Sequence, residues 1–282
     1  VRYLTHRIEL GLSSPVGFKV DADAEVRGHR VVFFQGGGVM PRHVLLGTNA
    51  RASRRRARWL QEAARLLAEA GAGAPRTQAK RALGLDVALA KARWPPRANR
   101  DLRRVLNRLD LDALQRLAPA LSWRDVLAQL KIPQAVKIVI VRQPSYLRRL
   151  SQLIASEGLE VWRAYLRVTL LDGLSAYLPR RLRLSAKQRG QKRGGTATAR
   201  RGFAMGFVRA FFDHELTSLY CETYVPKETL SRVRAMTFEL KKVLRARLER
   251  SPWMGEATRR AAVRKLDAMV AVSQIHSATC WK

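Results

Sequence analysis

Residues 253–266 read Trp253-Met254-Gly-Glu-Ala-Thr258-Arg-Arg-Ala-Ala262-Val-Arg-Lys265-Leu266. Ser251-Pro252 interrupts the chain just before them, because proline cannot continue a helix. The pattern then predicts a final helix from about Gly255 to Val270, and we expect Trp253 and Leu266 to be packing residues. The order Trp-Met, then Thr, Ala and Lys at helical spacing, distinguishes one protein family from another better than apolar periodicity alone does.

The segment just upstream predicts a long helix from Pro226 to about Arg250. Its apolar residues recur every three or four positions, which places them on one side of the helix. They are Leu230, Val233, Met236, Leu240, Val243, Leu244 and Leu248. Such a stripe is typical of a helix packed in a core, so we expect these side chains to be buried. Phe203 to Tyr224 predicts a further helix.

The first forty residues have a different pattern. Residues 16–20 and 31–34 are β-type runs, and the polar stretch 21–29 between them predicts a β-hairpin with a long loop. Gly36-Gly37-Gly38 then ends the second strand. A glycine run can cradle phosphate, but no Gly-Lys-Ser/Thr follows, so these glycines indicate a turn.

Between hairpin and final helices the chain is mostly helical in pattern. Two helices are predicted from apolar spacing: one from Asn49, with Trp59, Leu60, Ala63, Leu66 and Leu67 inward, and one at about 78–92, with Leu83, Val87, Leu89 and Ala90 inward. Further helices are predicted at 102–117 and 159–178, and two more begin at the capping residues Ser122 and Ser145. Residues 136–141 have a β-type pattern. The sequence therefore predicts a mainly α fold with many helices and a small β-hairpin near the N-terminus, as one domain over residues 1–282.

Charge is the unusual part of the composition. Lys plus Arg number 54 against 22 for Asp plus Glu, a net charge of +32, while an apolar fraction of 47% argues against wholesale disorder. Such a charge attracts polyanions without specificity. Arginine is, however, spread through nearly every segment, which also fits a compositional bias. Residues 180–201 are basic and contain no acid, so they predict either a solvated loop or a polyanion contact.

Cysteines and apolar runs say little about the compartment. Cys221 and Cys280 are too few for a disulfide framework, and free thiols are the simpler interpretation, although one bridge between them stays open. The residues that follow Val1 do not have the pattern of a signal peptide, so we expect none among them. The run 135–141 is too short to cross a bilayer, so we expect no transmembrane segment.

The sequence shows no catalytic, metal or cofactor residue. A His-Glu-x-x-His zinc site needs two histidines one helical turn apart with a glutamate beside them. Asp213-His214-Glu215 begins such a motif, but Ser218 stands where the second histidine is required, and none of the five histidines has a partner four positions away. There is also no Gly-x-Ser-x-Gly nucleophile motif.

The last third resembles the neprilysin family of zinc metallopeptidases, which includes endothelin-converting enzymes. That family carries Trp-Met, then Thr, Ala and Lys at helical spacing, and a Leu-Tyr-x-Glu motif upstream; it also has Asn-Arg-Asp and Pro-x-Tyr-Leu motifs earlier in the chain. The matching residues here, taken as structural signature residues, are Asn99, Arg100, Asp101, Tyr146, Tyr220, Glu222, Trp253, Met254, Thr258, Ala262 and Lys265.

Several positions depart from the family pattern. Pro41-Arg42-His43 has lost an acid and tyrosines, and Leu102 replaces the proline after Asn-Arg-Asp. The family's zinc motif, its downstream Glu ligand and its substrate-holding segment would all lie beyond residue 282. The resemblance therefore assigns no catalytic or metal residue to this chain, and zinc belongs to the full-length family.

The resemblance implies a function for the whole region. In the family, this part is a helical cap over a zinc catalytic domain, and the two enclose the peptide substrate. We therefore expect an incomplete, neprilysin-like cap domain without the catalytic zinc domain, inactive in peptide hydrolysis by itself. Family analogy suggests an extracytoplasmic location. The alternative is a basic helical module that binds polyanions through residues 180–201.

Overall fold

The computed structural model describes residues 2–23, 28–174, 177–182 and 196–269, and the chain divides into two units, residues 1–192 and 193–282. Unit 1 contains α1 (Arg2–Glu9), β1 (Val16–Ala22), β2 (His29–Gln35), α2 (Arg42–Leu45), α3 (Ala50–Glu69), α4 (Pro75–Ala92), η1 (Ala98–Arg100), α5 (Leu102–Val105), β3 (Asn107–Asp110), α6 (Leu111–Leu117), α7 (Trp123–Gln129), β4 (Ile138–Val141), α8 (Pro144–Ser156), α9 (Leu159–Gly173) and η2 (Arg180–Leu182). Unit 2 contains α10 (Thr196–Phe211), α11 (Asp213–Tyr224), α12 (Lys227–Glu249) and α13 (Glu256–Asp267). The mainly α prediction is confirmed.

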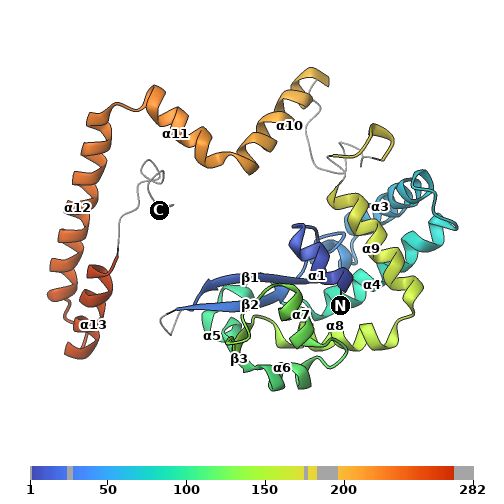
Figure 1. Ribbon diagram of the computed structural model, residues 1–282, viewed down its shortest axis with the longest axis horizontal. Helices are drawn as coiled ribbons and strands as arrows, with labels where there is room; N and C mark the ends of the chain where they lie inside the picture. The colour runs from blue at the N-terminus through green and yellow to red at the C-terminus, as the bar shows by residue number, and fades with distance from the viewer. Residues whose placement is uncertain (1, 24–27, 175–176, 183–195, 270–282) are drawn as a thin grey trace. The chain divides into compact units, whose positions relative to one another are not determined.

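The expected hairpin is part of a four-stranded sheet of order β1-β2-β4-β3 (Figure 1). β1 and β2 are antiparallel, β2 and β4 are parallel, and β4 and β3 are antiparallel. The register pairs Phe33 with Val141 and Asn107 with Val141. β4 therefore lies between the N-terminal hairpin and β3, and its Val139 pairs with Val31 across 108 residues of sequence.

The single helix expected at 102–117 is wrong. The structure has α5, the strand β3 and α6 in its place, because β3 pairs with β4 and two aspartates begin the flanking helices. The Asp101 carboxylate accepts from the backbone N–H of Arg103 at 3.1 Å, and that of Asp110 accepts from Ala113 at 2.6 Å. Carboxylates at these positions satisfy helix N–H groups that have no partner within the helix.

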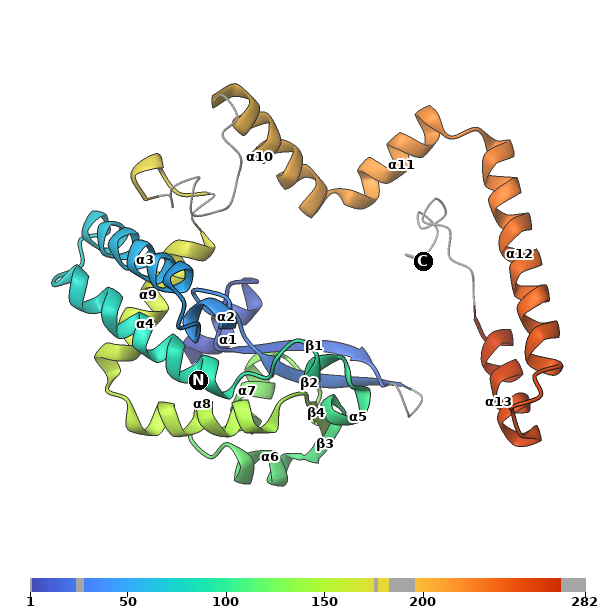
Figure 2. The same cartoon turned by 180° about the vertical axis from the view of Figure 1, so that it is seen from behind.

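A layer of helices packs at the other end of unit 1, with α4 between α3 and α9 (Figures 1 and 2). α3 begins as expected at Asn49, whose side chain accepts from the N–H of Ala52 at 2.9 Å. Trp59 and Leu67 on its inner side are buried with the core. Trp94-Pro95-Pro96 ends α4, as the sequence predicts.

Two other helix boundaries differ from expectation. At a third, Ser122 stands at the start of α7 as expected, but its side chain makes no capping bond. Ser145 lies inside α8, which begins at Pro144 after Gln143; the Ser145 hydroxyl instead accepts from Trp94 Nε1 at 2.8 Å. α9 ends at Gly173 rather than near 178.

Unit 2 is a series of helices with little buried surface of its own. The helix expected from Phe203 to Tyr224 is divided between α10 and α11. The long helix is confirmed as α12, and the final helix as α13, which follows Gly255 and buries Leu266. The expectation that the α12 stripe is buried is wrong in this chain: Leu240 is 68% exposed. Among the described residues, α12 packs mainly on α13, on a different side.

Some expectations fall on positions that the structure does not describe. Residues 183–195, the middle of the basic segment 180–201, are among them, and so is Cys280. Cys221 is buried on α11 and makes no disulfide with another described residue. The form of the basic segment and a bridge between the two cysteines therefore stay predictions.

Candidate functional site

The glycine run after β2 crosses the core at close range. The N–H of Gly36 donates to the carbonyl of Pro15 at 2.9 Å, and the carbonyl of Gly37 accepts from the Tyr165 hydroxyl at 3.2 Å. A Cβ atom at Gly36 would collide with the backbone carbonyl of Ser14. The glycines are thus needed for close backbone packing, and they follow β2 as an irregular segment without the expected turn.

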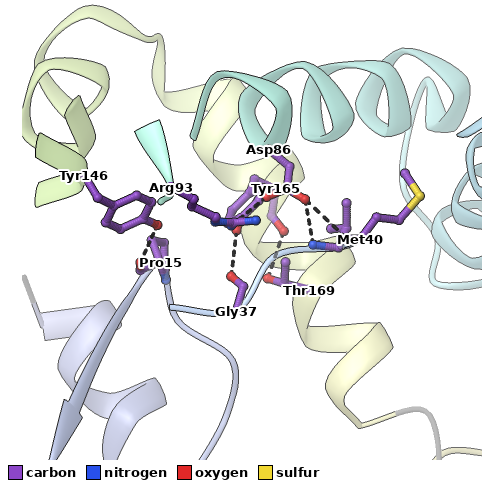
Figure 3. A network of polar contacts seen from close by, with 9 residues as sticks. Pro15, Gly37, Met40, Asp86, Arg93, Tyr146, Tyr165 and Thr169 are labelled. Carbon is purple, nitrogen blue, oxygen red and sulfur yellow. Dashed lines mark hydrogen bonds and ion pairs between the residues drawn. The ribbon is translucent and has the colours of Figure 1, made fainter. Parts of the chain in front are cut away.

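The residues around this crossing form a network of buried polar groups, with an ion pair on α4 at its centre (Figure 3). Arg93 Nη2 donates to Asp86 Oδ1 at 2.9 Å, and both side chains are buried. The other carboxylate oxygen of Asp86 accepts from the backbone N–H groups of Val39 at 2.9 Å and Met40 at 3.3 Å. One carboxylate therefore holds the loop after Gly38 against α4.

Burial and charge act in opposite directions on this pair. Burial raises the pKa of Asp86, against the lowering effects of Arg93 and the two backbone N–H groups. For Arg93, burial works to lower the pKa, but the Asp86 carboxylate, Tyr146 and Tyr165 together outweigh it and the net pKa is raised, so the guanidinium stays charged. Such a buried pair is costly to break because removing one partner leaves the other charge uncompensated.

Two tyrosines complete the network from α8 and α9. Tyr146 Oη donates to the carbonyl of Pro15 at 2.7 Å, and its ring lies 6.0 Å from the Arg93 guanidinium carbon. Burial raises the pKa of Tyr146 to about 12 and also raises that of Tyr165. Both hydroxyls are therefore neutral donors at ordinary pH.

A second buried cation ties α1 into the same region. Arg7 donates to the carbonyls of Ser13 at 2.7 Å and Leu166 at 3.0 Å, and to the Thr169 hydroxyl at 3.2 Å. The Thr169 hydroxyl in turn donates to the carbonyl of Tyr165 at 2.9 Å. All these contacts join elements of unit 1 to one another, and they place no nucleophile beside a base. We therefore interpret the network as a structural clamp.

The sequence analysis missed this network, although a signal was present. Asp86 lies on the inward side of α4 with the buried residues Ala79, Ala82 and Leu89, at helical spacing, and Arg93 follows seven residues later. A carboxylate on a buried helical side needs a partner. The arginine two turns away was the available candidate.

The structure brings some of the expected signature residues together in unit 1. Asn99 Oδ1 accepts from Gln143 Nε2 at 2.6 Å, one residue before α8, and Tyr146 is on the first turn of α8. Asp101 begins α5, and Arg100 is exposed. The Asn-Arg-Asp and Pro-x-Tyr-Leu motifs therefore meet at the start of α8.

The remaining signature residues lie in unit 2, on α11, at the α12–α13 connection and on α13: Tyr220, Glu222, Trp253, Met254, Thr258, Ala262 and Lys265. Tyr220 is exposed and its ring centre lies 5.2 Å from that of Tyr224. Trp253 was expected to be a packing residue, but it is the most exposed large apolar side chain described, at 78%. The backbone carbonyl of Met254 accepts a hydrogen bond from Arg259 at 3.1 Å.

The described residues do not fit a zinc site. No group of three His, Cys, Asp or Glu side chains in the described ranges comes close enough to hold a metal ion. His214 and Glu215 lie at the start of α11, and Ser218 follows on the same helix. A catalytic zinc needs three protein ligands, so no step of peptide hydrolysis can be assigned to these residues.

Comparison with known proteins identifies the family. Residues 2–274 match the model of the N-terminal region of peptidase family M13. The chain belongs to peptidase family M13. The resemblance to neprilysin-like zinc metallopeptidases is thereby confirmed, over nearly the whole chain.

Curated M13 relatives are similar at low identity. Endothelin-converting enzyme 1 of Rattus norvegicus is 26% identical over 213 residues, which cover 69% of this chain and 26% of that protein. Neutral endopeptidase of Lactobacillus helveticus is 24% identical over 264 residues, covering 91% of this chain and 40% of that protein. The chain thus spans well under half the length of these relatives.

Solved M13 structures share the fold. PepO from Lactobacillus rhamnosis is 25% identical with a TM-score of 0.77, covering 94% of this chain and 43% of that one. The zinc metalloprotease of Mycobacterium tuberculosis in its open state is 23% identical with a TM-score of 0.76, covering 95% and 42%. In the described residues of this M13 chain, no helix is both long and apolar enough to cross a membrane.

Proposed function

We propose that this chain is the non-catalytic cap portion of a neprilysin-like zinc metalloendopeptidase, and that its substrates are peptides. The observation that carries the proposal is the extent of the match: the M13 N-terminal model covers residues 2–274, while the chain spans only 26–43% of its relatives. The catalytic portion and its zinc would then be supplied by the remainder of such a polypeptide.

The buried clamp supports this role. The Asp86–Arg93 pair, Tyr146 and Tyr165 fix the sheet, the glycine crossing and α8 and α9 against one another. Such interlocked buried contacts suit a wall that limits access to a cavity, and they leave no polar group oriented for catalysis. By itself, the chain is expected not to hydrolyse peptides.

A peptidase assay tests the proposal. The purified chain is incubated with a quenched fluorescent peptide library, with and without added Zn²⁺, beside the Lactobacillus helveticus neutral endopeptidase as a positive control. The expected result is no zinc-dependent cleavage by the chain. Chelator-sensitive cleavage that survives repeated purification, and is lost in the variant His214→Ala/Glu215→Ala, would contradict it.

The alternative is a polyanion-binding module, and one described feature favours it. Arg51, Arg54 and Arg55 are exposed on the first turns of α3, and within the described ranges none of them has a carboxylate partner. Cations at a helix N-terminus oppose the helix dipole, so this cluster does not serve the stability of α3. It supplements the basic segment 180–201.

Salt dependence distinguishes this alternative from compositional bias. Affinity for a 20-base-pair duplex is measured at 50 and 200 mM salt for the chain and for Arg51→Gln/Arg54→Gln/Arg55→Gln. Polyanion binding through α3 predicts that the logarithm of the affinity falls less steeply with the logarithm of the salt concentration in this variant. The difference corresponds to the release of about three fewer counterions at most. The control Arg116→Gln/Arg148→Gln/Arg149→Gln removes the same charge elsewhere. Equal slopes in the two variants would reject a specific role for α3.

A further inference from the structure

β1 is an edge strand: it lies at one end of the strand order and, in the described residues, pairs with β2 alone (Figure 1). In an antiparallel ladder, residue pairs that exchange hydrogen bonds alternate with pairs that do not. The Pro15 carbonyl accepts from the N–H of Gly36 at 2.9 Å. At the other end of the hairpin, the N–H of Asp23 donates to the carbonyl of Gly28 at 2.9 Å. The odd-numbered residues of β1 therefore face β2, and the even-numbered ones direct their N–H and C=O groups outward.

Two of these residues have outward backbone groups without a hydrogen bond. The N–H of Ala22 donates to the Asp21 carboxylate at 3.0 Å, but within the described ranges the outward groups of Phe18 and Val20 have no partner. We call the N–H and C=O groups of Phe18 and Val20 the β1 edge. Proteins usually protect such an edge with proline, a bulge or charged side chains. The register of β1 is unbroken, and the charge of Lys19 is compensated by Asp21, so the β1 edge can accept another strand.

A pocket of about 430 Å³ adjoins the β1 edge at Val20, and unit 1 alone forms it. We call it the sheet pocket; its apolar lining includes Val20, Val31, Ile132 and Val136. Val20 shares a side of β1 with Phe18, whose ring centre lies 6.1 Å from that of buried Phe33. A strand added to β1 would place the side chain opposite Val20 on this same side, about 5 Å away. That side chain would meet the sheet pocket.

The charges around the sheet pocket favour an acidic ligand. Its described lining includes Arg30 and Lys137 and contains no carboxylate. Arg30 shares the Asp23 carboxylate with Arg108, so one acid serves two cations. Lys137 is exposed, and no carboxylate of the described residues lies within 4.0 Å of its ammonium group. A ligand with carboxylates beside an apolar side chain is the electrostatic complement of this lining.

A second copy of the chain is a poorer occupant of the β1 edge than a separate peptide. In a symmetric dimer the same surface meets itself, and pairing of β1 with β1 would bring together two chains that each carry a net charge of +32. An acidic peptide is attracted instead. When a peptide binds as an added strand, main-chain hydrogen bonds supply affinity and pockets for alternate side chains supply specificity. The β1 edge and the sheet pocket offer both.

We propose that the β1 edge binds an extended, acidic segment of a peptide substrate as an added strand, with a large apolar side chain of that segment in the sheet pocket. The outward groups of Phe18 and Val20 hydrogen-bond its backbone. Acidic residues two positions before and after the apolar one lie on the same side of the strand, toward Arg30 and Lys137. The inference rests on the proposed function, because it takes a peptide substrate as the occupant.

Calorimetric titration of the full chain with designed peptides tests this binding. The probe is the blocked peptide acetyl-Thr-Glu-Val-Phe-Val-Glu-Thr-amide, at physiological salt to screen non-specific attraction. With phenylalanine opposite Val20, the N–H groups of the phenylalanine and both glutamates face β1, and those of the two valines face away. N-methylation of the first set is expected to abolish binding, whereas N-methylation of the valines should leave most of it. Both methylated peptides keep the charge and side chains of the probe.

Variants of the chain test the same contacts from the protein side. Val20→Pro removes an outward N–H, and proline is tolerated on the outer side of an edge strand, so the probe should bind about tenfold more weakly. Val20→Thr keeps the N–H and the branched shape and should bind like wild type. Lys137→Glu should weaken binding about threefold, and Lys91→Glu, which reverses an exposed lysine on α4, should weaken it less. Equal losses in the two lysine variants would reduce the attraction to net charge and overturn the assignment to the sheet pocket.

Amide hydrogen exchange of Phe18 and Val20 reads the β1 edge directly. Both amides are expected to exchange rapidly in the free chain and at least tenfold more slowly with the probe bound. Slow exchange in the free chain would mean that other residues already occupy the edge, and would overturn the proposal. Absence of binding, equal binding of the two methylated peptides, or dimerisation of the chain that Val20→Pro abolishes would overturn it as well.

These outcomes are separate from those of the proposed function. Intrinsic peptidase activity of the chain would contradict the cap role, whatever binds at β1. Failure of the probe to bind, with the chain still inactive, would leave the cap role standing and remove only the peptide site at the β1 edge.

Discussion

The hydroxyl of Tyr146, on the first turn of α8, donates to the carbonyl of Pro15, just before β1, across 131 residues of sequence. Tyr146 belongs to the Pro-x-Tyr-Leu motif that the sequence shares with the M13 family. Its ring also faces Arg93, whose guanidinium is held by Asp86. One side chain thus connects a signature motif, the sheet and the buried ion pair.

Replacing Tyr146 by Phe is expected to destabilise the chain only slightly. The Pro15 carbonyl also accepts from the N–H of Gly36, so it keeps a hydrogen bond when the hydroxyl is removed. The free energy of unfolding, measured by urea denaturation, should fall by about 1 kcal/mol. Tyr146→Ala leaves a cavity as well and should cost about 3–5 kcal/mol. Equal losses in the two variants would show that the ring contributes little.

Alkaline pH is expected to weaken the fold through Tyr146. Its pKa is about 12 in the folded chain and near 10 when exposed, so between these values the unfolded chain releases a proton that the folded chain keeps. The free energy of unfolding is unaffected below pH 10 and then falls, by about 1.4 kcal/mol per pH unit for this group.

Tyrosinate absorbance measured against pH checks this expectation. Tyr146 should ionise near pH 12, or abruptly on unfolding. Tyr146→Phe is the control, since its stability should fall less steeply between pH 10 and 12. Ionisation of all six tyrosines in a single step near pH 10, with the fold intact, would be incompatible with a buried Tyr146.

Breaking the Asp86–Arg93 pair on one side is expected to be severe. Asp86→Ala leaves the buried Arg93 without its carboxylate and frees the N–H groups of Val39 and Met40. The loss should be about 3–5 kcal/mol in urea denaturation. Asp86→Leu/Arg93→Met removes both charges and should recover part of it. A double variant less stable than Asp86→Ala would mean that the arginine contributes independently of its partner.

Structural features that depend on residues close together in the sequence could be predicted, whereas features that depend on contacts between distant residues could not. Local signals were sufficient for the hairpin, for Asn49 at the start of α3 and for the C-terminal end of α4, because each is decided by neighbouring residues. β3 was not predicted, because Asn107–Asp110 is a strand only through pairing with β4, thirty residues later.

The same reasoning explains the errors about burial. An apolar stripe shows that a helix has something to bury, but it does not identify what buries it. On α3 the stripe meets α4, and Trp59 is buried; on α12 the corresponding stripe is exposed among the described residues. The Asp86–Arg93 clamp depends on the loop at Val39, 47 residues from Asp86, and sequence periodicity does not show that contact.

Adding one methyl group at Gly38 is expected to disturb the same clamp. A Cβ at this position would collide with Asp86 Oδ1 and reach 2.5 Å from Arg93 Nη2, and neither atom can move without losing the ion pair or a backbone hydrogen bond. Gly38→Ala should therefore destabilise the chain by about 1–3 kcal/mol, the usual cost of overpacking.

Gly84→Ala is the matched control for this substitution. Gly84 lies on the same helix as Asp86, and its Cβ would meet no atom within 4 Å. Alanine is the better helix former, so this variant should gain about 0.5–1 kcal/mol. Urea denaturation of the two variants should thus give shifts of opposite sign. If Gly38→Ala were neutral, the backbone after Gly37 would have room to move away from Asp86, and the clamp would be looser than these contacts indicate.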